Sequence, residues 1–321
     1  GEILAAGSPR APDSALAASH GARFPIAQGP MTRVSDSPAF ARAVADGGAL
    51  PFLALALMRA EQVDALLADT AGVMGDAPWG VGILGFVPQA LREEQCEAIF
   101  RHKPSYALIA GGRPDQAAEF EARGIPAYLH APSPALLALY REQGARRFVF
   151  EGRECGGHIG PLASFPLWEQ MIDQLDGEVS DAEAPEIHLL FAGGISDASS
   201  AAMIAALTAP LAARGMKIGV LMGTAYLFTH EIVDTGAIVP GFQQEALACA
   251  RTRSLETGPG HATRCADTRF AGEFARQRRE LLASGQSAEA IRDALEDLNL
   301  GRLRLASKGR DRDAQGPLVE I

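Results

Sequence analysis

The sequence predicts an α/β protein built on a closed (β/α)8 barrel with a helical lobe appended after it. Three observations favour this fold. About eight short apolar runs alternate with stretches of helical spacing, as in successive βαβ units. The runs are continuously apolar, which indicates strands covered on both faces of a parallel sheet. Glycines follow the first, fourth, sixth, seventh and eighth runs, at the end of a barrel where loops approach ligands. An open doubly wound sheet is the alternative.

The individual elements follow from local patterns along the chain. A helix beginning near residue 38 carries Phe40, Ala43 and Val44 on one face and is closed by Gly47-Gly48. The predicted strands cover residues 24–28, 52–56, 81–84, 106–110, 127–130, 148–151, 187–192 and 218–222. The other predicted helices cover residues 59–70, 89–101, 115–123, 134–143, 167–175 and 198–211, with a short helix after the last strand.

The chain divides into three parts. Residues 1–20 are rich in Ala, Ser and Pro without a strong period, so we interpret them as a leader or linker. The barrel is predicted to occupy residues 21–239. Residues 240–321 form the lobe, in which 270–283 and 288–298 have the spacing of amphipathic helices and a polar tail follows. Because the chain does not start with methionine, we expect a domain cut or processed from a longer protein.

Composition excludes several classes of partner. With 321 residues, of which 47% are hydrophobic, the chain can bury a large core. A net charge of -10 without any Lys/Arg-rich run argues against nucleic acid and anionic membranes as partners. No apolar run is long enough to span a membrane, and no secretory leader is visible. The four cysteines are far apart and form no Cys-x-x-Cys, so we expect no disulfide framework and a reducing cytoplasm.

One stretch combines a strand with a loop suited to chemistry. The predicted strand at 148–151 opens into Gly152-Arg153-Glu154-Cys155-Gly156-Gly157-His158-Ile159-Gly160. Glycine lets the backbone approach a ligand closely, and histidine transfers protons near neutral pH. Since active sites of such barrels lie at the carboxyl ends of the strands, we predict a catalytic role for His158. The alternative is a loop histidine that donates to a backbone carbonyl.

Two glycine turns follow the seventh and eighth predicted strands. They read Ala192-Gly193-Gly194-Ile195-Ser196-Asp197 and Met222-Gly223-Thr224. Backbone N–H groups beside a helix N-terminus bind anions without any positive side chain. Phosphate sites in (β/α)8 barrels often follow these same two strands. We therefore predict a phosphate site here, with ordinary tight turns as the alternative.

Two other patterns are rejected. The segment Gly80-Val81-Gly82-Ile83-Leu84-Gly85 matches G-x-G-x-x-G, but its glycines lie inside the strand. No acidic residue ends a strand about 20 residues later, so this is not a dinucleotide-binding motif. His230-Glu231 is not followed by a second histidine, and no metal site is predicted.

Three further residues are weaker candidates. Cys155 is three residues from His158, but nothing nearby in sequence is positioned to activate it as a nucleophile, so a packing role is preferred. His130 ends the fifth predicted strand and is the second candidate for a substrate-contacting histidine. His261 follows Gly258-Pro259-Gly260 and is a third, although a turn is the default interpretation of that segment.

Taken together, four segments resemble the nitronate monooxygenase family, formerly called 2-nitropropane dioxygenases. Its relatives include the FMN-dependent enoyl-acyl-carrier-protein reductases. The segments, in family order over about 200 residues, are Pro25-Ile26-Ala27-Gln28-Gly29-Pro30-Met31, the stretch from Glu151 to Gly160, Phe191-Ala192-Gly193-Gly194-Ile195, and Leu221-Met222-Gly223-Thr224. The Gly-Gly-His-x-Gly element is quite specific. The resemblance implies a TIM barrel that holds FMN at its mouth.

The resemblance also implies roles for individual residues. Gly29, Pro30 and Met31 would lie against the isoalloxazine ring, and His158 would face the substrate near the reactive nitrogen of the flavin. The remaining contacts to FMN and its phosphate would come from Gly82, Gly156, Gly157, Ala192, Gly193, Gly194, Met222, Gly223 and Thr224. At position 82 the chain departs from the family, because relatives have Gly-Val-Asn where it has Gly80-Val81-Gly82. A hydrogen bond supplied by that asparagine would be lost.

One branch of the family is more similar than the rest. Residues 22–58, Leu298-Asn299-Leu300-Gly301-Arg302-Leu303 and Lys308-Gly309 resemble the flavin domain of large polyketide or polyunsaturated-lipid synthases. The implied activity is NAD(P)H-dependent reduction of an enoyl thioester, with an acyl carrier protein, other synthase domains and a second copy of the chain as partners. The alternatives are nitronate oxidation with FMN and O2, and a flavin-free structural module, which only Gly82 supports.

Overall fold

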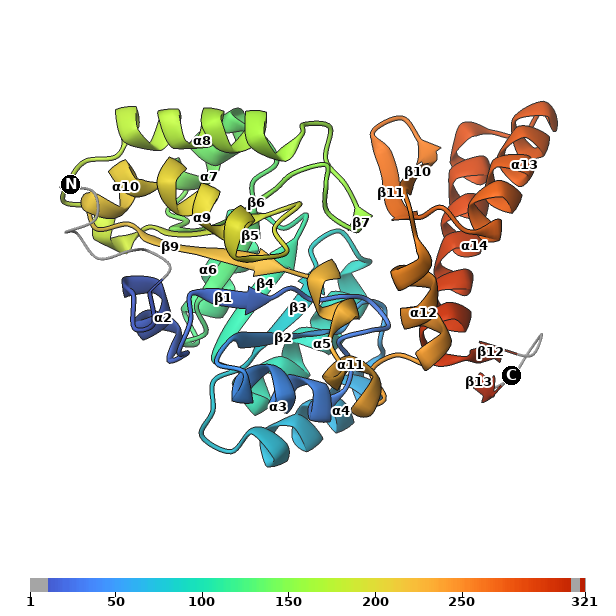
Figure 1. Ribbon diagram of the computed structural model, residues 1–321, viewed down its shortest axis with the longest axis horizontal. Helices are drawn as coiled ribbons and strands as arrows, with labels where there is room; N and C mark the ends of the chain where they lie inside the picture. Colours follow the sequence, from blue (N-terminus) through green and yellow to red (C-terminus); the bar gives the residue numbers. More distant parts are fainter. Residues whose placement is uncertain (1–10, 313–317, 321) are drawn as a thin grey trace.

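The computed structural model describes residues 11–312 and 318–320. Its centre is a closed barrel of eight parallel strands in the order β1-β2-β3-β4-β5-β6-β8-β9 (Figure 1). The predicted (β/α)8 fold is therefore confirmed. The strands are β1 (Ile26–Gln28), β2 (Leu50–Ala54), β3 (Gly80–Leu84), β4 (Tyr106–Ala110), β5 (Ala127–His130), β6 (Arg147–Glu151), β8 (His188–Ala192) and β9 (Lys217–Met222).

Helices cover the outside of the barrel. They are α3 (Pro38–Asp46), α4 (Ala60–Met74), α5 (Gln89–His102), α6 (Pro114–Glu121), α7 (Pro134–Glu142), α8 (Ser164–Glu178), α9 (Ala198–Leu207) and α10 (Ala209–Ala213), with short turns at η1 (Ala184–Glu186), η2 (Thr224–Phe228) and α11 (Glu231–Asp234). The prediction of a single helix at 198–211 is wrong, because the helix is interrupted at Thr208. Pro210 has no N–H to continue α9 and instead occupies the first turn of α10.

Serine–proline pairs begin two of these helices. The Ser37 hydroxyl accepts from the N–H of Phe40 before α3, and the Ser133 hydroxyl accepts from the N–H of Leu136 before α7. In each case proline fills the next position, where a missing N–H costs nothing. These local signals fix where each helix starts relative to the strand before it.

Two layers of apolar side chains hold the barrel together. Alternate residues of each strand point inward, and the buried residues inside the barrel are Leu16, Ala27, Leu50, Phe52, Tyr106, Leu108, Tyr128, Val149, Leu190 and Ala192. The intervening residues pack outward against the helices, as Phe191 does against Trp168 of α8. Both faces of the strands are buried, which explains their continuously apolar sequences.

A short helix closes the amino-terminal end of the barrel and corrects the interpretation of residues 1–20. Residues 15–20 form α2 (Ala15–His20), and Leu16 is fully buried against Gly219 of β9. The Tyr106 hydroxyl donates to the carbonyl of Ser19 over 2.6 Å, and His20 Nε2 lies 2.7 Å from the Tyr128 hydroxyl. The prediction of a leader or linker is therefore wrong for this helix, and residues 1–10 lie outside the described residues. A helix of six residues is too short to reveal its period.

The C-terminal lobe contains more than the two predicted helices. Both helices are present, as α13 (Arg269–Ala283) and α14 (Ala288–Lys308), and α14 extends into the segment predicted as a polar tail. The lobe also contains α12 (Pro240–Ala248), β12 (Arg310–Arg312), β13 (Leu318–Glu320) and an unpredicted hairpin of β10 (Thr252–Gly258) and β11 (His261–Ala266). The part of this lobe at 313–317 and 321 lies outside the described residues.

The lobe contacts the barrel at several places, among them the end of α14 and the loop after β6. At the end of α14, the Lys308 ammonium lies 2.6 Å from Asp36 Oδ1 and donates to the carbonyl of Ala237 over 2.7 Å. In the loop after β6, β7 (Gly157–His158) leaves the barrel and joins the lobe hairpin as a third strand (Figure 1). The loop that carries His158 is therefore shared between barrel and lobe.

Candidate active site

The loop after β6 carries His158 to the interface between barrel and lobe. Within β7, His158 pairs with Thr263 of β11 in antiparallel register. The next residue, Ile159, donates its N–H to the carbonyl of Ala262 over 3.0 Å. Two backbone interactions with the hairpin therefore fix the main chain of the loop at the carboxyl end of the barrel, where the sequence places a catalytic residue.

The imidazole of His158 faces a carboxylate from the lobe. His158 Nε2 lies 3.5 Å from Glu296 Oε2 on α14. The Thr257 hydroxyl donates to the other oxygen, Glu296 Oε1, over 2.6 Å. Glu296 raises the pKa of His158 above its ordinary value, against the opposing effect of partial burial, and His158 lowers the pKa of Glu296. Both shifts favour an imidazolium beside a carboxylate.

A cavity of about 320 Å³ lies at the barrel mouth beside His158. Its wall consists of Gly111, His130, Ala131, Pro132, Leu136, Tyr140, Val149, Glu151, His158, Ile159 and Gly160. The structure thus brings His130 and His158 to one cavity, as the sequence predicts for the barrel mouth. His130 Nδ1 lies 3.0 Å from Glu151 Oε2. His130 Nε2 is buried and has no hydrogen-bond partner among the described residues.

Cys155 packs against the barrel interior beside these groups. Burial raises the pKa of its thiol, and the carboxylate of Glu151 raises it further. A nucleophilic cysteine needs the opposite environment, one that stabilises the thiolate. The surroundings of Cys155 therefore favour the packing role over the nucleophile.

The predicted phosphate-binding turns adjoin the His158 loop. Gly193 and Gly194 have φ angles of +115° and +74°, which favour glycine. The N–H groups of Gly193, Gly194 and Gly223 donate to no acceptor among the described residues, as an anion-binding turn requires. A Cβ placed on Gly156 would lie 3.0 Å from the Thr224 hydroxyl. The loop after β6 and the turn after β9 are therefore neighbours, and within that loop Gly157 connects Gly156 to His158.

The segment after β1 lies beside the same turns. Gly29 donates its N–H to the carbonyl of Met222 over 2.9 Å, and the Met31 side chain approaches Gly223. Ala192 and Met222 are the last residues of β8 and β9. Apart from Gly82, which lies within β3, the residues that the family resemblance assigns to FMN thus follow or end the neighbouring strands β6, β8, β9 and β1 at one end of the barrel. The N–H groups and the small residues around them fit the phosphate of FMN.

The presence of glycine at position 82 of this chain has a steric reason that is not visible in the sequence. A Cβ at this position would lie 2.3 Å from Cβ of Pro30 and 2.4 Å from its Cγ. The proline ring therefore fills the space into which a side chain at position 82 would extend. At Gly82 the segment after β1 therefore packs directly against β3.

The remaining predicted residue lies outside the cavity. His261 is exposed at the turn of the β10–β11 hairpin, which confirms the turn interpretation of residues 258–261. Glu296 and Thr257 were missed by sequence reasoning, and so was the pairing of Glu151 with His130. No local pattern marks Glu296, because its partner His158 lies in a different part of the chain.

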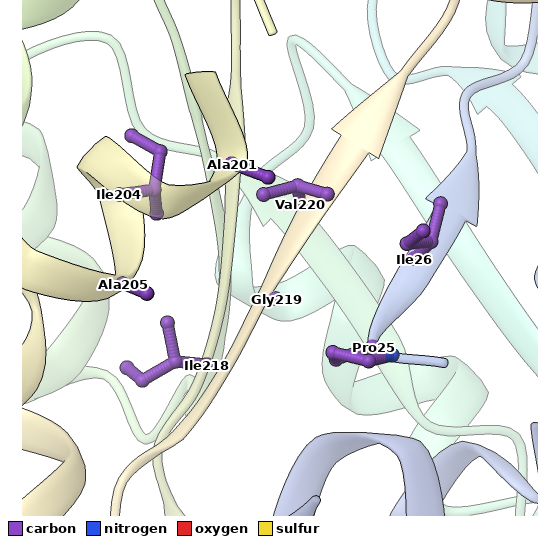
Figure 2. A pocket seen from close by; sticks show the side chains of 8 residues that line it. All are labelled: Pro25, Ile26, Ala201, Ile204, Ala205, Ile218, Gly219 and Val220. Carbon is purple, nitrogen blue, oxygen red and sulfur yellow. The ribbon is translucent and has the colours of Figure 1, made fainter. Parts of the chain in front are cut away.

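A second cavity of about 170 Å³ lies on the outer face of the barrel, between α9, β9 and β1 (Figure 2). Its lining is apolar and contains no predicted site residue: Pro25, Ile26, Ala201, Ile204, Ala205, Ile218, Gly219 and Val220. In residues 11–312 and 318–320, no group of three or more His, Cys, Asp or Glu side chains is placed to bind a metal ion. No helix in these same ranges is both long and apolar enough to cross a membrane.

The sequences of two relatives align with most of this chain. Both are named (3aS,4S,5R,7aS)-5-hydroxy-7a-methyl-1-oxo-octahydro-1H-indene-4-carboxyl-CoA dehydrogenase. The protein from Rhodococcus jostii is 26% identical over 279 residues, covering 85% of this chain and 71% of the relative. The protein from Mycobacterium tuberculosis is 28% identical over 280 residues, covering 80% of this chain and 72% of the relative. No protein-family model matches the chain.

Solved structures confirm the fold. FabK from Thermotoga maritima matches with a TM-score of 0.72 and 23% identity, over 91% of this chain and 83% of FabK. The enoyl reductase domain of MlnA from Bacillus amyloliquefaciens has a TM-score of 0.69 and 15% identity, over 93% and 80%. Nitroalkane oxidase from Streptomyces ansochromogenes has a TM-score of 0.66 and 18% identity, over 91% and 90%. The fold implied by the family resemblance is thus the fold of this chain.

Proposed function

We propose that the protein is an FMN-dependent oxidoreductase that reduces an enoyl thioester with NAD(P)H. The observation that carries this proposal is the convergence of a histidine-lined cavity and two glycine turns at the carboxyl end of the barrel. A thioester is favoured over a nitronate because both relatives are named as dehydrogenases of a carboxyl-CoA compound. The fold shared with the enoyl reductase domain of MlnA also supports it.

The glycine turns would hold the cofactor. Backbone N–H groups of Gly193, Gly194 and Gly223 would bind the phosphate of FMN, and the N-terminus of α9 would add its dipole. The segment from Gly29 to Met31 would lie against the flavin ring. A bound FMN would supply hydride transfer, which no side chain of the protein provides.

His158 would supply the proton. In the net reaction the carbon–carbon double bond is reduced, NAD(P)H is oxidised, a hydride adds to the β-carbon and a proton adds to the α-carbon. Because Nε2 faces Glu296, the proton available for transfer is the one on Nδ1. The raised pKa of His158 keeps more of the imidazole protonated near neutral pH, as a proton donor requires.

The substrate would be an acyl group on CoA or on a carrier protein. Resemblance to synthase-embedded flavin domains favours a carrier protein, and a synthase or a second copy of the chain is the proposed setting. The thioester would lie in the cavity between His130 and His158, with Glu151 holding His130 in place.

Stopped-flow spectroscopy of the FMN-loaded protein tests the proposal. We expect a visible flavin spectrum, bleaching by NADPH or NADH, and reoxidation by crotonyl-CoA. Bleaching by an alkyl nitronate alone would identify the protein as a nitronate oxidase. Failure to bind FMN would refute both enzyme functions and favour the flavin-free structural module. The variant His158→Ala should still bind FMN but reoxidise more slowly with crotonyl-CoA, by on the order of a hundredfold or more.

A further inference from the structure

We propose that Glu296, held by Thr257, is the positioning residue of His158, so that the lobe completes the active site of the barrel. This inference rests on the proposed function and deepens it. It assigns to α14 and the β10–β11 hairpin a part in the reaction, besides packing. The three residues concerned lie on three different elements: β7, β10 and α14.

The position of the Glu296 carboxylate is determined by groups of the lobe, independently of His158. Thr257 is only 4% exposed, and its hydroxyl donates to Oε1 over 2.6 Å, which leaves Oε2 for His158. The neighbouring residue Leu295 is fully buried in the lobe core, against Leu255 of the same strand as Thr257. The packing of α14 on β10 therefore determines where the carboxylate lies.

The histidine is fixed from the same side. The pairing of His158 with Thr263, and the hydrogen bond from Ile159 to Ala262, attach its backbone to β11. The hairpin thus positions the main chain of His158, and α14 positions the side chain. With Nε2 held toward Glu296, the opposite ring nitrogen, Nδ1, is left for substrate.

The pair is too exposed to serve mainly as a structural ion pair. The side chains of His158 and Glu296 are 66% and 32% exposed, and ion pairs in such positions contribute little to stability. Their effect falls on the protonation and orientation of the imidazole. Among the described residues, the other titratable groups that line this cavity are Glu151 of β6, His130 of β5 and Tyr140 of α7, of which Glu151 also favours the imidazolium. His261 of β11 acts on Glu296.

An NMR titration of His158 in the full chain tests the inference without flavin or substrate. In Glu296→Gln the pKa of His158 should fall, and in Thr257→Val it should fall by a smaller amount. The matched control is Asp297→Asn, which removes the next carboxylate on α14, at an exposed position, and should leave the titration unchanged. Circular dichroism should show that all three variants fold. An unchanged His158 titration in Glu296→Gln would overturn the inference.

The catalytic half of the inference is tested in the FMN-loaded protein. Glu296→Gln should lower the pH at which reoxidation by crotonyl-CoA declines, with a loss of rate smaller than that of His158→Ala. Flavin reduction by NAD(P)H should be unaffected, and Glu296→Asp should restore part of the rate. A wild-type protein that never reduces a thioester refutes the proposed function, whereas an active wild type with an identical pH profile in Glu296→Gln refutes the positioning role.

Discussion

Replacing Gly82 with alanine should destabilise the barrel although it adds only one methyl group. The new Cβ would lie 2.3 Å from Cβ of Pro30, whereas carbon atoms in contact are about 3.5–4.0 Å apart. The proline ring is closed on its own backbone and cannot rotate away. The segment after β1 therefore has to move away from β3 by more than an ångström.

The expected cost follows from this overlap. Overpacked cores lose about 1–3 kcal/mol, and the reduced freedom of the unfolded chain returns about 0.4–1 kcal/mol when glycine becomes alanine. A net loss of about 1–2 kcal/mol is expected. The control is Gly72→Ala, because Gly72 is exposed on α4 and a Cβ there meets nothing within 4 Å. This control should gain about 0.5–1 kcal/mol.

Urea unfolding of the flavin-free protein measures both variants. The midpoint should fall for Gly82→Ala and rise for Gly72→Ala, and Gly82→Asn should fall at least as far as Gly82→Ala. A Gly82→Ala midpoint equal to that of the wild type would show that Pro30 moves freely, and the steric reason for a glycine at this position would be wrong. Flavin titration of the same variants would then show whether the displaced segment contacts the cofactor.

Three further predictions concern other parts of the molecule. Gly194→Ala should weaken FMN binding, measured by flavin fluorescence, because a left-handed φ of +74° costs a residue with a side chain about 1–2 kcal/mol; an unchanged affinity would remove this turn from the site. Burial lowers the pKa of His20 and of His188 to about 3, so both are neutral in the folded protein. Stability should therefore fall as the pH drops from about 6.5 toward 3, and the urea midpoint of His188→Gln should depend less on pH than that of the wild type. Because its thiol pKa is raised by burial and by Glu151, Cys155 should react with iodoacetamide more slowly than Cys249, as judged by mass spectrometry of the labelled peptides, and equal rates would contradict the assigned environment.

The barrel could be predicted because its determinants are local. Each strand is buried on both faces, so its sequence is apolar throughout, and a helix with a polar outer face follows it. The β10–β11 hairpin carries no such pattern. In Thr252–Gly258 only Leu255 and Thr257 are buried, since one side of the strand packs on the lobe and the rest faces solvent. With a single large apolar residue among five polar or charged ones and a glycine, neither strand periodicity nor burial is visible in the sequence.

The same difference between local and long-range determinants separates the residues of the candidate site that could be predicted from those that could not. The glycine turns and His158 are recognisable because the loop after a strand must contain the residues that its backbone conformation requires. Glu296 is different. The apolar spacing of α14 indicates that Ile291 and Leu295 are buried, but it does not indicate which loop lies opposite Glu296. That loop is determined by how β7 joins the hairpin, a pairing of strands far apart in the chain. A motif can therefore identify the group that transfers a proton, while the carboxylate that orients it depends on the docking of the lobe.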